Sequence, residues 1–142
     1  MHQRLLTALA LAFVALVILQ SLLGGLLLFQ TIGFSIPQII AHYHDKSLHG
    51  LLEVILPHTL FIAIALMAVI HFLAFIQTIS ETAKKMATHI LFVLFFCDQI
   101  SPILISYGIG FFAYVKIIAF VGFEGALAAV WFIIFYQTLK EI

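Results

Sequence analysis

The chain has 142 residues, of which 65% are hydrophobic and 8% are Asp, Glu, Lys or Arg, with a formal net charge of zero. A soluble domain of this length cannot bury so much apolar side chain, because soluble proteins are typically about half apolar and about a quarter charged. The composition therefore indicates an integral membrane protein in one domain, and the lack of a basic block argues against a nucleic-acid partner.

Four apolar stretches are each long enough to cross a bilayer, for which a helix needs about 20 residues. They cover residues 5–29, 51–76, 86–107 and 111–136. We expect helices, because a spanning backbone must satisfy its own hydrogen bonds and the alternation of a β-barrel is absent. The first stretch is longer than the apolar region of a signal peptide, so we expect it to be retained. The predicted fold class is all-α, an antiparallel four-helix transmembrane bundle.

The segment between the first two spans predicts a short amphipathic helix over residues 36–46 that lies on the membrane surface. Ser35 suits the N-cap of this helix, and Pro37 suits its first turn. We expect Ser47 or Gly50 to end it before the second span begins. Its apolar side chains recur at helical spacing: Ile36, Ile39, Ile40 and Tyr43.

The orientation is predicted from the basic residues that flank the spans. Arg4 precedes the first span, Lys84 and Lys85 lie between the second and third, and Lys140 follows the fourth. An even number of spans places all of these on one side. Because Lys and Arg concentrate in cytoplasmic loops, both termini are predicted to be cytoplasmic, in a bacterial inner membrane.

Two histidines are predicted at similar depth near the inner surface, His71 in the second span and His89 in the third. Neutral imidazoles on facing helices can ligate a haem iron from both sides, and bundle cofactor sites are built in this way. The pair is therefore our candidate for the axial ligands of haem b. The alternative is that each imidazole lies near the headgroups and bonds a backbone carbonyl, which the proximity of Lys85 to His89 favours.

A second polar group is predicted in the outer half of the spans. At about 1.5 Å per residue, His58 lies about 10 Å from the outer surface, Asp98 about 13 Å and Lys116 about 8 Å, with Glu53 near the rim. Asp98 and Lys116 suit an ion pair that joins the last two helices, or a proton-transfer pair. His58, Asp98 and Glu53 are candidates for handling quinone or protons.

Two prolines accompany this outer group. Pro57 and Pro102 each remove a helix hydrogen bond and can leave a carbonyl open, beside His58 and near Asp98 respectively. Deeper in the fourth span, Glu124 has no opposite charge at its predicted depth. An ionisable residue in that position is a functional candidate, so Glu124 is our candidate for a protonatable residue in transport.

The outer segment is rich in histidine, and this gives a weaker hypothesis of a zinc or copper(II) site. The candidate ligands are His42, His44, Asp45 and His49. His42, Asp45 and His49 would form one stripe with Glu53 if a single helix continued through Gly50, and His42 and His44 form an H-x-H pair. The alternative is a hydrated surface segment, since short histidine-rich tracts are only compositional signals.

Small residues recur at i, i+4 in the fourth span, as Gly122 with Ala126 and Gly125 with Ala129. Such pairs let helices approach closely in membranes. They indicate either packing within the bundle or a contact between two copies of the chain. Both a monomer and a homo-oligomer are compatible with this spacing.

Three functional hypotheses follow. The first is a haem b-binding or quinone-linked membrane subunit of an electron-transfer complex. The second is a small proton-coupled or metal-handling transporter, and the third is a non-catalytic structural or assembly subunit of a membrane complex. The sequence contains no phosphate-binding glycine loop, no G-x-S-x-G and no H-E-x-x-H, so an enzyme acting on its own is not expected.

Overall fold

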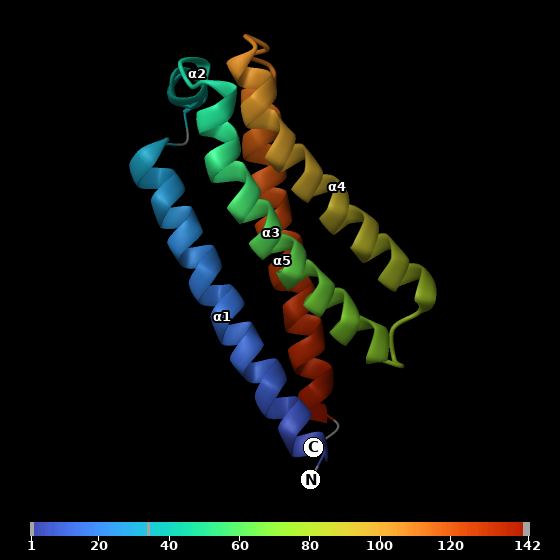
Figure 1. The fold of residues 1–142 in the computed structure, drawn as a ribbon. Coiled ribbons are helices and arrows are strands. Elements are labelled where there is room, and N and C mark those ends of the chain that lie inside the picture. Colours follow the sequence, from blue (N-terminus) through green and yellow to red (C-terminus); the bar gives the residue numbers. More distant parts are fainter. Residues whose placement is uncertain (1, 34, 141–142) are drawn as a thin grey trace.

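The computed structural model describes the backbone of residues 2–33 and 35–140, and the side chains of residues 8, 9, 11–33 and 35–137. The side chains of Arg4 and Lys140, which contribute to the predicted orientation, lie outside this description. Within it the chain is all-helical, with four long antiparallel helices and one short helix (Figure 1). The helices are α1 (His2–Thr31), α2 (Ile36–His44), α3 (Leu48–Phe75), α4 (Glu81–Ser106) and α5 (Phe112–Lys140).

The four long helices are each apolar and long enough to cross a membrane, which confirms the predicted fold class. The short helix α2 lies between the first and second of them, as expected. In Figure 1 α2 is seen nearly end-on while the long helices run along the bundle, so α2 crosses one end of it. We call this the outer end and the opposite one, where α1 begins and α5 ends, the inner end.

The turn that follows α1 requires a glycine at position 33. Gly33 has φ +76, a left-handed conformation that side chains with a Cβ rarely adopt. Its N–H donates to the carbonyl of Leu28 at 3.0 Å, which satisfies one of the last carbonyls of α1. A Cβ at this position would collide with the side-chain amide of Gln38 in α2. The turn therefore places α2 against the end of α1.

Helix α2 is shorter than predicted because the chain breaks at residues 45–47. Asp45 is its C-cap, and Ser47 is the N-cap of α3. The Ser47 hydroxyl accepts a hydrogen bond from the N–H of Gly50 at 3.2 Å, which begins the new helix. Of the two expected breaking points Ser47 is thus the one used, and Gly50 lies inside α3.

Helices α4 and α5 form a closely packed hairpin. They are joined by a short turn in which Gly108 has φ +86. A Cβ added to Gly122 of α5 would lie 3.2 Å from Leu94 of α4, and Ala126 packs against the buried core. A Cβ on Gly125 would have no neighbour within 4 Å. Gly122 and Ala126 therefore pack within the bundle, whereas Gly125 and Ala129 face outward.

Two apolar clusters hold the described helices together. Near the inner end the rings of Phe13, Phe72 and Trp131 join α1, α3 and α5, with centroids 5.7 to 6.4 Å apart. Near the outer end α2 covers α3, α4 and α5, with these residues buried: Ile39, Tyr43, Leu51, Ile105 and Ala113. The second cluster closes the outer end of the bundle.

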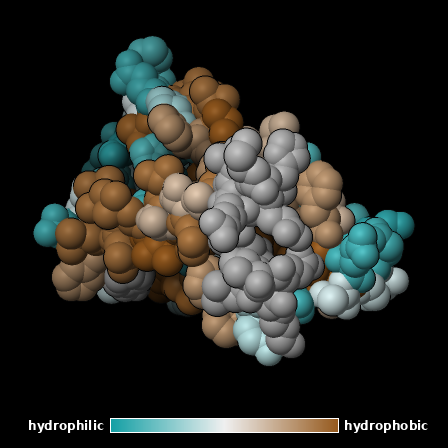
Figure 2. All heavy atoms as spheres, turned by 90° about the horizontal axis from the view of Figure 1, so that it is seen from below, coloured by the Kyte–Doolittle hydropathy of each residue, from teal (hydrophilic) through white to brown (hydrophobic). Residues whose placement is uncertain are grey.

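Most of the remaining apolar side chains point outward. Leu22, Phe61 and Phe132 are each about two-thirds exposed, and many other large apolar residues are similarly open. Seen from the inner end, the described surface is mostly hydrophobic, and the hydrophilic residues gather in separate patches at the edge (Figure 2). An apolar surface of this extent fits a protein whose long helices contact lipid or neighbouring membrane helices.

Candidate functional site

The centre of the outer half is an ion pair between α4 and α5. The Nζ of Lys116 lies 2.6 Å from Oδ1 of Asp98, and each side chain is only 12% exposed. The pair expected from predicted depth is therefore formed. Each charge is costly in a membrane on its own, and at this distance each compensates the other.

A proline in α4 strengthens this contact. In a regular helix the carbonyl of Asp98 would accept from the N–H of residue 102, but that residue is Pro102, which has no N–H. The open carbonyl instead accepts a second hydrogen bond from Lys116 at 3.3 Å. One turn of α4 thus offers the ammonium both a carboxylate and a backbone oxygen.

The ion pair continues into α3 through two uncharged side chains. Gln99 donates from Nε2 to Oδ2 of Asp98 at 2.9 Å, and the Thr59 hydroxyl donates to Oε1 of Gln99 at 3.1 Å. Helices α3, α4 and α5 are therefore joined by one hydrogen-bonded chain. We call Thr59, Gln99, Asp98 and Lys116 the polar network. Thr59 and Gln99 were not among the predicted site residues, although each is an uncharged polar residue within an apolar span.

Tyr43 of α2 lies at the outer side of this network. The side chain is buried in the outer cluster. Burial raises the pKa of the Tyr43 phenol, and the nearby negative charge of Asp98 raises it further. Tyr43 thus brings α2 close to the Asp98 end of the polar network.

Two of the spanning histidines are fixed by their own helices. The Nδ1 of His58 lies 3.0 Å from the carbonyl of Val54, and the Nδ1 of His89 lies 2.8 Å from the carbonyl of Lys85. Since a carbonyl can only accept, Nδ1 carries the proton in both rings. When either ring is neutral, its Nε2 keeps a lone pair for another partner, the arrangement that is common in histidine ligands.

The predicted haem ligands are both on the surface of the bundle. His71 is exposed and packs edge-on against Phe75 of its own helix, with centroids 4.8 Å apart. His89 lines an open hollow between the inner ends of α3 and α4, and His71 does not. The carbonyl bond of His89 is the contact that the alternative to haem ligation predicts, although it leaves Nε2 of a neutral ring open to a metal. The described contacts of His71 are with aromatic rings.

Glu124 lies on α5, two turns further inward than Lys116, and is half-buried. Within the part of the chain whose side chains are described, no ion pair reaches its carboxyl group.

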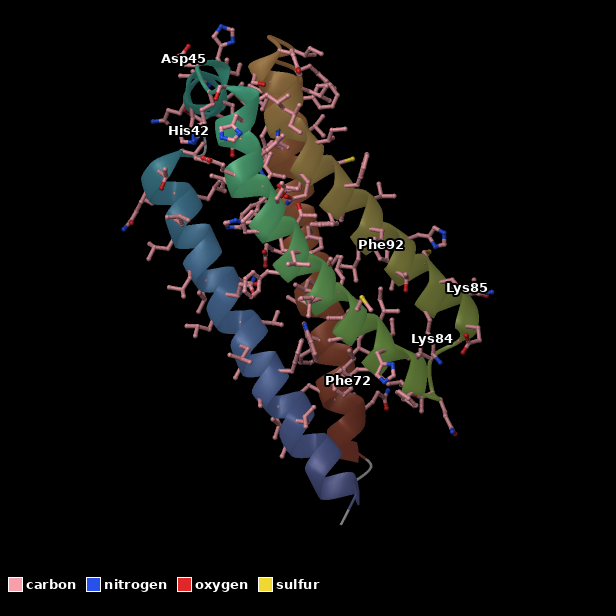
Figure 3. All side chains as sticks on the ribbon, viewed as in Figure 1. His42, Asp45, Phe72, Lys84, Lys85 and Phe92 are labelled. Atoms are coloured by element: carbon pink, nitrogen blue, oxygen red, sulfur yellow. The ribbon has the colours of Figure 1, made fainter. Side chains whose placement is uncertain are left out.

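The outer histidines are distributed over two helices, with His42 and His44 in α2 and His49 in α3. Figure 3 shows His42 and Asp45 at the outer end of the bundle. Lys46 lies with its Nζ 2.8 Å from Nε2 of His42, which occupies that lone pair, and His49 Nε2 lies 3.2 Å from Glu53. His44 and Asp45 are exposed. The break at residues 45–47 prevents the single stripe that a continuous helix would give. Among the described residues no three His, Cys, Asp or Glu side chains lie close enough to hold a metal ion.

The comparison with protein families extends these observations. Residues 41–141 match the model of the Aq_1264_TM family, which is described as a transmembrane helical domain. The chain belongs to this family. The matched region begins in α2 and includes the whole polar network, all of α3 and α4, and α5 through to its end. No curated protein and no solved structure matches the chain.

Proposed function

We propose that this member of the Aq_1264_TM family is a non-catalytic membrane subunit, a helical bundle that works by associating with another protein in the bilayer. The observation that carries this proposal is the state of Asp98. Its Oδ1 contacts Lys116 and its Oδ2 accepts from Gln99, so both carboxylate oxygens are used to hold helices together. A carboxylate that carries protons or ions must exchange its partners during turnover. Both oxygens of Asp98 are hydrogen-bonded to other side chains, which favours a structural role.

The surface of α3 supports a protein partner. His58 is exposed within the span and keeps a free Nε2, and Phe61 beside it is 66% exposed. An imidazole that faces hydrocarbon is unfavourable, so polar residues at such positions usually meet another protein group or a cofactor. A neighbouring helix that offers a hydroxyl or amide donor to His58 would satisfy this ring.

Photo-crosslinking in native membranes tests the proposal. A benzophenone amino acid at Phe61 should give one adduct of defined mass, and His58→Leu should weaken that adduct. The matched control is the same probe at Leu22 of α1, which is equally exposed. An adduct pattern at Phe61 that is as diffuse as at Leu22 and insensitive to His58 would reject a protein partner on this face. An adduct of twice the chain mass would identify a second copy as the partner.

A second candidate function is supported by the geometry of His89. Its Nδ1 bonds the Lys85 carbonyl and leaves Nε2 available, as in an axial ligand. In this proposal His71 and His89 hold haem b, which would supply one-electron transfer to a quinone-linked complex. The chain's own part is to orient His89 through the Lys85 carbonyl and to surround the group with apolar side chains.

Absorption spectroscopy separates the two candidates. Protein purified from haem-sufficient cells should show a Soret band that shifts on reduction with dithionite, together with sharp α and β bands. His89→Ala and His71→Ala should each abolish these bands, while His58→Ala should keep them. A featureless spectrum of the unmodified protein would reject haem and leave the first proposal unaffected.

A further inference from the structure

An open hollow of about 190 Å³ lies between the inner ends of α3 and α4. Its α3 wall is apolar and consists of Ile70, Leu73 and Ala74. Its α4 wall is polar and includes the first two turns of that helix, from Glu81 to His89. The hollow thus has one wall suited to hydrocarbon and one suited to a charged group, at the end of two spanning helices.

The first lysine of the α4 wall is engaged by the protein. The Nζ of Lys84 donates to Oε1 of Glu81 at 2.8 Å and to the backbone carbonyl of Ala74 at 3.1 Å, and its side chain is 11% exposed. Lys84 therefore links the end of α3 to the start of α4 and compensates the charge of Glu81. Figure 3 shows Lys84 and Lys85 at this end of α4.

The second lysine, Lys85, is not hydrogen-bonded as Lys84 is, although its charge also acts on the nearby Glu81 carboxylate. Among the described side chains Lys85 makes no ion pair, and it lines the hollow together with Thr88 and His89. These residues are spaced i, i+3 and i+4 and therefore share one face of α4. The N-terminus of α4 adds a partial positive charge to the same place. The α4 wall thus carries two lysines against one carboxylate, which Lys84 holds, together with a hydroxyl donor and the helix terminus.

We propose that this hollow binds the headgroup of an anionic phospholipid. The phosphate lies against Lys85 and Thr88, and the first part of an acyl chain lies along Ile70, Leu73 and Ala74. Basic pockets between spanning helices at the membrane boundary are suited to such headgroups. A free phosphate would use only the polar wall, and the apolar wall is the reason for choosing the lipid.

Native mass spectrometry of the full chain tests this site with phosphatidylglycerol and phosphatidylcholine as probes. Phosphatidylglycerol should bind more tightly, and Lys85→Gln should weaken it about fivefold, since one lysine near an anionic surface contributes about that factor. The matched control is Lys46→Gln, which removes the same charge at the outer end and should change nothing. Equal binding of the two lipids, or equal loss in both variants, would overturn the proposal.

A second pair of measurements identifies the source of the phosphate. Ala74→Leu adds bulk to the apolar wall and should weaken phosphatidylglycerol binding while leaving the charge unchanged. Glycerol 3-phosphate should compete only at concentrations far above that of the lipid. Competition at equal concentration would show a soluble phosphate site and overturn the lipid assignment. Lys85 and Ala74 are both exposed, and circular dichroism of each variant checks that the helices are retained.

Discussion

The outer half of the bundle contains a buried ion pair, whereas most of the charged and histidine side chains at the inner end are exposed. In the outer half Asp98 and Lys116 are largely buried and bond to each other, and α2 packs over the outer end of the bundle. In the inner half His71, Lys85 and His89 stay on the surface. At the inner end Lys84 still links α3 to α4, but the exposed Lys85 and His89 beside the hollow remain open to outside partners.

The largest expected loss of stability comes from removing the ion pair in the outer half. Lys116→Leu leaves the Asp98 carboxylate buried without its cation and should cost about 3–5 kcal/mol in the free energy of unfolding. Unfolding of the protein in mixed micelles with increasing sodium dodecyl sulfate measures this. The double change Asp98→Leu with Lys116→Leu should recover most of the loss, because no unpaired charge remains. If Lys116→Leu is as stable as Lys85→Leu, which changes the inner half, the contrast between the halves is wrong.

The next effect concerns how closely α4 and α5 pack. Gly122→Leu forces a side chain against Leu94 and should cost about 1–3 kcal/mol, as overpacking does in other cores. Gly125→Leu on the same helix has open space and should be nearly neutral. The same unfolding measurement compares them. A larger loss at Gly125 would show that this outward face is covered by another helix in the membrane.

A smaller effect is expected at the link to α3. Thr59→Val keeps the shape of the side chain and removes the hydrogen bond to Gln99, so it should cost about 0.6 kcal/mol, the average for such bonds between membrane helices. Thr82→Val, at an exposed position of α4, is the control and should be neutral. Equal stability of the two variants would show that the polar network ends at α4.

The smallest expected effect is a dependence of the free energy of unfolding on pH, which comes from His42 in α2. Burial, and then the nearby Lys46 ammonium, lower the pKa of His42 below its ordinary value of 6.5. The folded chain then binds fewer protons than the unfolded one, so the contribution of His42 is complete above pH 6.5 and is lost as the pH falls through the lower folded pKa. Titration of the ring by nuclear magnetic resonance measures this, with exposed His44 as the reference. A His42 that titrates at or above 6.5 would contradict it, and His42→Gln should abolish the dependence.

The sequence predicts the helices well and the contacts between them only in part. The apolar runs are long and clearly bounded, so the four spans and the short amphipathic helix follow from hydrophobicity alone. The Asp98–Lys116 pair follows from equal depth on adjacent helices. The link from Gln99 to Thr59 does not, because it depends on how α3 is rotated about its axis, which the packing of the whole bundle decides.

The residue at which α2 gives way to α3 is likewise not decided by the sequence pattern alone. Ser47 and Gly50 were both plausible breaking points, and the choice depends on whether the Ser47 hydroxyl can reach the N–H of Gly50. The stripe from His42 to Glu53 depended on that choice, and it does not form. The haem b, quinone and transport roles of the histidines and of Glu124 stay predictions.

The short hairpin between α4 and α5 has a consequence for how the protein enters the membrane. A lone lysine or aspartate at the centre of a spanning helix disfavours insertion by about 2.5–3.5 kcal/mol. Asp98 and Lys116 are on consecutive helices separated only by residues 107–111, so each can neutralise the other before either is released into lipid. The last two spans are therefore expected to leave the insertion machinery together as one unit, with Pro102 already exposing the carbonyl that receives the lysine.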